Sequence, residues 1–201
     1  MPSRKVAFRV DASSQIGSGH LMRCLTLAAA LKKQGFYVLF ICRNISRQLQ
    51  SLVESNYELK ILIGAESTNI GGTLAHSNWL RASQEVDLVD SEKALGSEIW
   101  DWVVVDHYAI DCTWESELKK KGLARRILVI DDLADRMHDC DVLLDQNLGR
   151  ACEDYANLVP DNCVLLVGPL YALVRDEFLS LRQKSLKRRK KYKLENILIT
   201  M

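Results

Sequence analysis

The sequence predicts an α/β fold, a Rossmann-like parallel sheet with helices on both faces. Two observations carry this prediction. Short, continuously apolar segments alternate along the chain with segments whose apolar residues recur at helical spacing, as in βαβ units. Most of the apolar segments are followed by polar loops, and strands without a polar face suit a sheet that is covered on both sides.

The expected strands are the apolar runs Val6 to Val10, Tyr37 to Cys42, Leu59 to Ile63, Trp102 to Val105, Ile127 to Ile130 and Val142 to Leu144. The expected helices are His20 to Gln34, Ser46 to Glu54, Asn78 to Leu95, Cys112 to Lys121 and Tyr171 to Leu181. The segment from Gly64 to Ser77 is rich in Gly, Ser, Thr and Asn, so we expect a loop there that can close over a ligand.

The composition excludes several classes of protein. With 48% hydrophobic and 26% charged residues, the 201-residue chain has the profile of a globular protein. It shows neither the apolar core of a signal peptide nor the roughly 18 apolar residues that span a bilayer, so we expect a cytoplasmic location. The six cysteines are scattered without metal-ligand spacing and are expected to be reduced thiols.

A basic run occupies residues 182–193, with eight basic residues and no acidic one, whereas residues 1–181 carry a net charge of −6. Such a run can bind nucleic acid or anionic lipid. Without interleaved aromatic residues we favour a solvated linker and expect neither nucleic acid nor membrane as a partner. Because the apolar segment Asn196 to Thr200 follows it, we expect a first domain over 1–181, a linker over 182–193 and the first strand of a truncated second domain over 194–201.

The loop from Ser13 to His20 (SSQIGSGH) is the most informative candidate for a ligand site. In open α/β sheets, ligands bind at the carboxyl ends of the strands, and here two glycines allow close approach to a helix N-terminus that favours phosphate. The full G-x-G-x-x-G pattern is absent because residue 22 is Met, which disfavours a dinucleotide. The residues expected to contact the ligand are Ser14, Gln15, Gly17, Ser18 and Gly19.

His20 has two interpretations. On the first turn of its helix it would lie beside a bound diphosphate, where the helix N-terminus keeps an imidazole unprotonated and available as a base. It could equally do no more than cap the helix. After the strand that ends near residue 105, Asp106 and His107 are expected to contact the ligand, although His107 could instead bond a backbone carbonyl. Tyr108 is better placed to reach into the cleft.

Asp131 and Asp132 could bind a metal ion together with His138. Carboxylates at strand ends more often bond loop N–H groups or cap the next helix. We therefore expect no metal, and no other cofactor, in this protein.

Four blocks of the sequence resemble, in the same order and at similar spacing, the UDP-2,4-diacetamido-2,4,6-trideoxy-β-L-altropyranose hydrolases of pseudaminic acid biosynthesis. They are FRVDASSQIGSGHLMRC, VVVDHYAID, IDDLADRMHDCDVLLDQN and GPLYALVRDEFLSLR. The resemblance implies the GT-B fold of the MurG-like glycosyltransferases, with this chain as its N-terminal domain. It also implies attack by water at the anomeric carbon of a UDP-sugar, C–O cleavage and inversion, with His20 as the base and Tyr108 near the catalytic centre.

The resemblance further implies a second domain that supplies most of the contacts to uridine and diphosphate. We therefore expect residues 1–201 alone to bind UDP poorly and to be inactive, which calorimetric titration with UDP measures directly. Tight binding would contradict this expectation. Two alternatives stay open: a MurG-like glycosyltransferase, which would pass the sugar to an acceptor, and a non-catalytic protein whose basic run binds nucleic acid or membrane.

Overall fold

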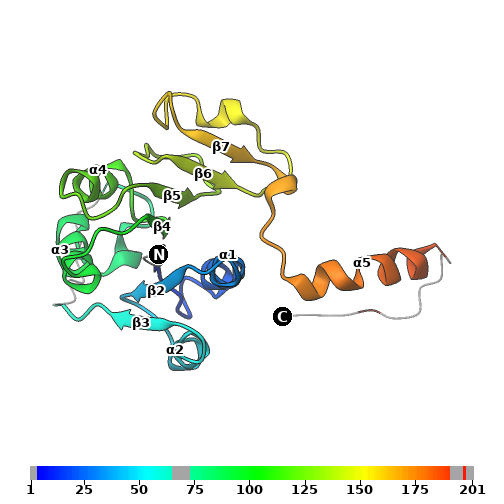
Figure 1. Ribbon diagram of the computed structural model, residues 1–201. Helices are drawn as coiled ribbons and strands as arrows, with labels where there is room; N and C mark the ends of the chain where they lie inside the picture. The colour runs from blue at the N-terminus through cyan, green and yellow to red at the C-terminus, as the bar shows by residue number, and fades with distance from the viewer. Residues whose placement is uncertain (1–3, 65–72, 191–196, 198–201) are drawn as a thin grey trace.

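The computed structural model describes residues 4–64, 73–190 and 197. Within them, seven parallel strands form one sheet in the order β3-β2-β1-β4-β5-β6-β7, which confirms the expected Rossmann-like architecture (Figure 1). The strands are β1 (Lys5–Val10), β2 (Tyr37–Cys42), β3 (Glu58–Ile61), β4 (Trp102–Asp106), β5 (Ile127–Ile130), β6 (Val142–Asp145) and β7 (Val164–Val167).

Helices pack on both faces of this sheet (Figure 1). The α-helices are α1 (Gly19–Lys33), α2 (Arg47–Glu54), α3 (Gln84–Leu95), α4 (Cys112–Lys120) and α5 (Asp176–Arg189). The 3-10 helices are η1 (Ser77–Leu80), η2 (Cys152–Tyr155) and η3 (Pro169–Tyr171). Helices α1 and α2 cover one face, and α3 and α4 cover the other. No helix in the described ranges is both long enough and apolar enough to cross a membrane.

The alternation of side chains along the strands builds one core on each face. On β1, Ala7 packs in the core under α3 and α4, whereas Val6 and Phe8 pack in the core under α1 and α2. The Phe8 ring stacks on Phe40 of β2 at a centroid distance of 4.9 Å. Arg9 is a charged residue in this otherwise apolar part of β1. Its side chain is only 1% exposed, and a buried cation needs anionic partners.

The expected helix from Asn78 to Leu95 is wrong in its first half. The chain forms the 3-10 helix η1, and Arg81 then takes a left-handed backbone conformation with φ of 56°, which ends that helix. Helix α3 starts anew after Ser83, whose side chain accepts a hydrogen bond from the backbone N–H of Val86. A serine cap and an acidic first turn favour a new helix start at this point.

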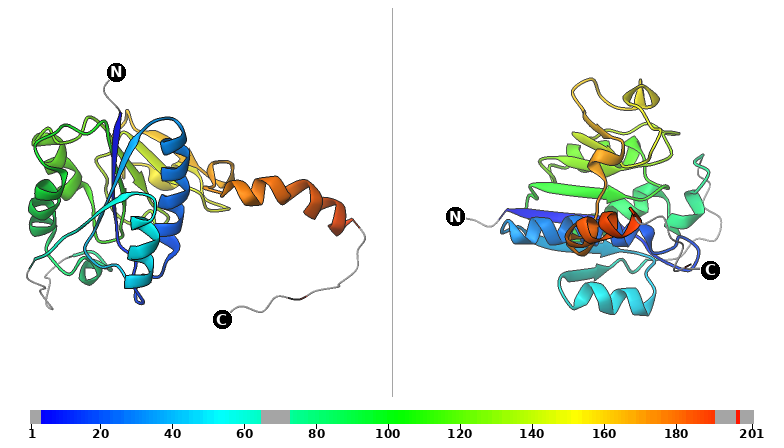
Figure 2. Two further views of the ribbon diagram at one scale, coloured as in Figure 1. Left: turned by 60° about the horizontal axis from the view of Figure 1, so that its bottom comes forward. Right: turned by 90° about the vertical axis from the view of Figure 1, so that its right-hand side faces the viewer.

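The end of the chain also differs from the expectation. Strand β7 was not predicted, and the helix expected from Tyr171 begins only at Asp176 because the Leu173 backbone N–H is tied to the Gln146 side chain at 3.0 Å. Helix α5 buries none of its residues and projects away from the sheet, continuing through the basic run to Arg189 (Figure 2). The expected strand from 196 to 200 lies outside the described residues, apart from Ile197, and the domain limits stay a prediction.

The strand order places a switch point between β1 and β4. The chain leaves β1 toward β2 on one side and later returns to β4 on the other, and Val10 pairs with Asp106 in register. At such a point the loops that follow the two strands diverge and leave a crevice at the carboxyl edge of the sheet. The loop from Ser13 to His20 follows β1 at this point. Asp106 is the last residue of β4, and His107 and Tyr108 follow it.

Candidate functional site

The loop after β1 presents its polar residues to solvent. Ser14, Gln15, Gly17, Ser18 and Gly19 are exposed, and a Cβ atom built on either glycine meets nothing within 4 Å. Gly17 has φ of +84°, a conformation that suits glycine and few other residues. The backbone can thus be approached closely at the start of α1, as the sequence predicts, although the ligand contacts themselves stay a prediction.

His20 does not cap its helix. Its ring is 8% exposed, and Nδ1 lies 2.5 Å from Oδ1 of Asp106 at the end of β4. Because an ionised carboxylate only accepts hydrogen bonds, Nδ1 must carry the proton. The Nε2 atom then keeps its lone pair, and within the described part of the chain no hydrogen bond occupies it. A carboxylate that orients an imidazole in this way leaves the opposite nitrogen ready to accept a proton.

Arg23, one helical turn after His20, holds the carboxylate in place. Its guanidinium donates to both oxygens of Asp106, each at 2.6 Å. Burial by itself would raise the pKa of Asp106, but Arg23 and His20 hold it well below its usual range. The orienting carboxylate therefore stays ionised. Arg23 is not among the residues predicted for the site, although the spacing of three residues places it on the same helix face as His20.

Tyr108 lies against the candidate base. The two rings meet edge to face, with centroids 4.6 Å apart, and the Tyr108 hydroxyl donates to Asp132. Asp132 also accepts from Arg23 at 2.8 Å, so Arg23 joins both carboxylates. Burial and the Asp132 carboxylate raise the pKa of Tyr108 above its usual value, which keeps the phenol protonated. The structure thus brings the two predicted catalytic residues, His20 and Tyr108, together.

A second network of charges lies under the site. Arg9 binds Asp11 at 2.7 Å and Asp87 at 2.8 Å, and Arg43 binds the same Asp87 at 3.0 Å. His107 contacts Asp11 through Nε2 at 3.2 Å. The side chains of these five residues are at most 5% exposed. The ring of His107 faces this buried network, and its expected contact with a ligand stays a prediction.

The protonation of His107 follows from its partners. The Ala109 backbone N–H donates to Nδ1 at 3.1 Å, so Nε2 carries the hydrogen and donates it to Asp11. Burial lowers the pKa of His107, although Asp11 opposes this effect. The folded protein therefore holds the His107 ring neutral. The two hydrogen bonds of the ring fix the turn that carries Tyr108.

The stability of the protein is expected to fall as His107 is driven toward protonation. An unfolded histidine takes up a proton near pH 6.5 and the folded one only at lower pH, so the unfolded state binds more protons below that value. The free energy of unfolding should then decrease with falling pH by up to about 1.4 kcal/mol per pH unit from this one group. Urea titrations of the wild type and of His107→Gln at pH 7.5, 6.5 and 5.5 measure the effect. An unchanged pH slope in the variant would contradict the assignment.

The candidate metal ligands do not converge. Asp131 pairs with Arg136 at 2.8 Å, whereas His138 binds Glu115 at 2.8 Å. Asp132 turns instead to Arg23 and Tyr108. Across the described residues, no group of three or more His, Cys, Asp or Glu side chains is placed to hold a metal ion. All six cysteines are free thiols, and none takes part in the contacts of His20.

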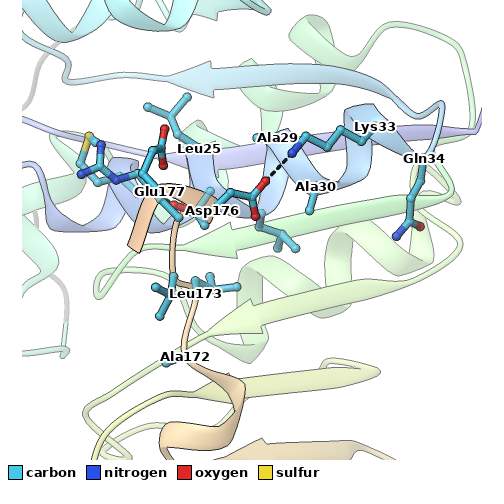
Figure 3. Close-up of a pocket in the computed structure, with 14 residues that line it drawn as sticks. Leu25, Ala29, Ala30, Lys33, Gln34, Ala172, Leu173, Asp176 and Glu177 are labelled. Atoms are coloured by element: carbon cyan, nitrogen blue, oxygen red, sulfur yellow. Dashed lines mark hydrogen bonds and ion pairs between the residues drawn. The ribbon is translucent and has the colours of Figure 1, made fainter. Parts of the chain in front are cut away.

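A pocket of about 600 Å³ lies away from this site, between α1 and the segment that leads into α5. Figure 3 shows its lining, where Leu25, Ala29 and Ala30 face Leu173, and an ion pair joins Lys33 to Asp176. The lining is mostly apolar and holds neither a histidine nor a cysteine. The carboxylates Asp176 and Glu177 of this pocket lie on the exposed helix α5, whereas the carboxyl edge of the sheet holds a buried histidine oriented by a carboxylate.

The chain is similar in sequence to known proteins. The chain is 33% identical over 189 residues to the UDP-2,4-diacetamido-2,4,6-trideoxy-beta-L-altropyranose hydrolase of Campylobacter jejuni subsp. jejuni serotype O:2. This chain is similar to a UDP-sugar hydrolase. The aligned region covers 94% of this chain and 57% of that relative. The identity supports the family resemblance seen in the sequence.

A second relative is more distant. An uncharacterized protein of Methanocaldococcus jannaschii is 20% identical over 198 residues, which cover 97% of this chain and 36% of that protein. No family model matches the chain. The chain therefore spans little more than half the length of the first relative and about a third of the second.

Proposed function

We propose that this protein is a hydrolase that removes UDP from UDP-2,4-diacetamido-2,4,6-trideoxy-β-L-altropyranose, as a member of the GT-B superfamily. The observation that carries the proposal is the pair His20–Asp106 at the switch point of the sheet, 2.5 Å apart, with Nε2 of His20 left available. The similarity to a hydrolase of that substrate supports the choice of UDP-sugar.

In the proposed reaction, His20 acts as general base. Water gives a proton to Nε2 while its oxygen attacks the anomeric carbon. The bond between this carbon and the diphosphate oxygen breaks, its electron pair leaves with UDP, and the configuration inverts. Asp106 holds the ring in the required tautomer and stabilises the imidazolium that forms. A positioned base of this kind contributes typically a factor of about 10²–10⁴ to the rate.

Departure of UDP places negative charge on the diphosphate. The N-terminus of α1 is expected to stabilise this charge. The first backbone N–H groups of that helix are free of helical partners and carry the positive end of its dipole. The exposed glycine loop, Gly17 to Gly19, allows the diphosphate to approach. The two ion pairs of Arg23, with Asp106 and with Asp132, fix His20 and Tyr108 relative to this helix end.

The proposal is tested with the full-length protein in water enriched in ¹⁸O. The expected result is release of UDP with the label in the anomeric hydroxyl group of the sugar and inverted configuration by NMR. Label in the phosphate of UDP would mean P–O cleavage and would contradict the mechanism. UDP release that requires an added acceptor would identify a glycosyltransferase of the MurG-like group instead.

A further inference from the structure

We propose that Trp79 and His76 form an aromatic wall beside His20 that binds the apolar face of a deoxy, N-acylated sugar. The inference rests on the proposed function and adds the residues that recognise the sugar. Neither residue is among those predicted for the site from the sequence.

The rings form a continuous series that ends at the candidate base. The centroids of His76 and Trp79 lie 4.4 Å apart, and that of Trp79 lies 5.7 Å from Tyr108. Tyr108 in turn contacts His20 at 4.6 Å. His76, Trp79 and Tyr108 are only half-buried, so each keeps exposed surface. An apolar surface therefore borders the atom that is proposed to activate water.

The backbone that carries Trp79 is anchored in the core. Directly after Trp79, Leu80 is 1% exposed and Ala82 is 3% exposed, so both are anchored in the core. Between them, Arg81 adopts its left-handed conformation and turns the chain into α3. A surface that is already ordered loses little conformational entropy when a ligand binds. The aromatic wall is thus preorganised rather than assembled around the sugar.

The chemistry of these rings selects the class of sugar. Ligand sites combine apolar and aromatic lining with a few polar groups, and burial of each further methyl or methylene group adds affinity. The wall offers ring faces, and the one hydroxyl group among them, that of Tyr108, already donates to Asp132. Hydroxyl groups of a sugar that pack against these ring faces would lose hydrogen bonds to water without replacement. A sugar in which methyl and acylamino groups replace hydroxyl groups would lose fewer.

Saturation-transfer NMR on the full-length protein tests this inference without any need for turnover. The probe is a free 2,4-diacetamido-2,4,6-trideoxyhexose, compared with glucose. We expect saturation of its acetyl and C6 methyl signals and little transfer to glucose. In Trp79→Ala the affinity should fall by roughly 10-fold or more, the lower end of what a lost apolar contact costs. Trp79→Phe should keep most of the affinity.

The matched control is Trp102→Phe, at the amino end of β4, which should bind like the wild type. If Trp79→Ala does not fold, the ¹⁹F signal of fluorotryptophan at position 79, assigned with Trp79→Phe, decides the matter in the wild type. A shift on addition of the probe supports the wall, and an unmoved signal overturns it.

The outcomes separate this inference from the proposed function. UDP release from the nucleotide sugar without transfer to the methyl groups would overturn the wall and leave the hydrolase intact. Transfer that depends on Trp79 in a protein that releases no UDP would support the wall and contradict the hydrolase.

Discussion

Replacing His20 by asparagine in the full-length protein should lower the turnover of UDP release by about 10²- to 10⁴-fold, the usual contribution of a general base. The asparagine amide can still donate to Asp106, so the buried carboxylate keeps a partner and the fold is expected to survive. What the variant loses is the nitrogen at the position of Nε2, the atom that no hydrogen bond occupies in the described part of the chain.

The measurement is steady-state release of UDP by the wild type and by His20→Asn. Gln34→Ala, at the far end of α1, is the matched control and should behave like the wild type. Near-normal turnover in His20→Asn would remove the residue from its proposed role.

Replacing Asp87 by alanine should lower the free energy of unfolding by about 3–5 kcal/mol, the cost of leaving a buried charge without its partner. Asp87 is fully buried on α3 and accepts from Arg9 at 2.8 Å and from Arg43 at 3.0 Å. Burial would lower the pKa of Arg9, and Asp11 and Asp87 together raise it above its usual value. Arg9 therefore stays charged in the variant, with one of its two carboxylates gone.

Urea denaturation measures this loss, and Glu92→Ala is the control on the same helix. Glu92 pairs with Lys121 at 2.8 Å, but both side chains are more than one third exposed. Such surface pairs contribute about 0–1 kcal/mol. A loss in Asp87→Ala no larger than that of the control would mean that the network under the site does not hold the fold together.

The sequence by itself determined the parallel α/β fold and the place of its candidate site. Continuous apolar runs such as Tyr37 to Cys42 need cover on both faces, and this local property is visible in any short window. The polar loop with its two glycines, followed by His20 at the start of a helix, is equally local. The similarity to a UDP-sugar hydrolase extends over 94% of the chain.

Local pattern failed where a distant contact decided the outcome. The helix expected from Asn78 breaks because Leu80 and Ala82 are drawn into the core and Arg81 turns the backbone between them. Strand β7 exists because it pairs with β6, and the ladder hydrogen bonds of this edge strand are all made to that one neighbour. The break after Leu80 leaves no periodic signal in the residues, whereas Val164 to Val167 is a continuous apolar run of the kind that predicts a buried strand.

Only the tertiary structure decided the partners of the catalytic candidates. Asp106 is separated from His20 by 86 residues, and the two meet because β4 pairs directly with β1 at the switch point. The order of parallel strands depends on which connections cross the sheet, which no single segment specifies. The same packing places His107 against the buried carboxylate of Asp11, because a buried charge needs a partner. It also places Trp79 beside Tyr108.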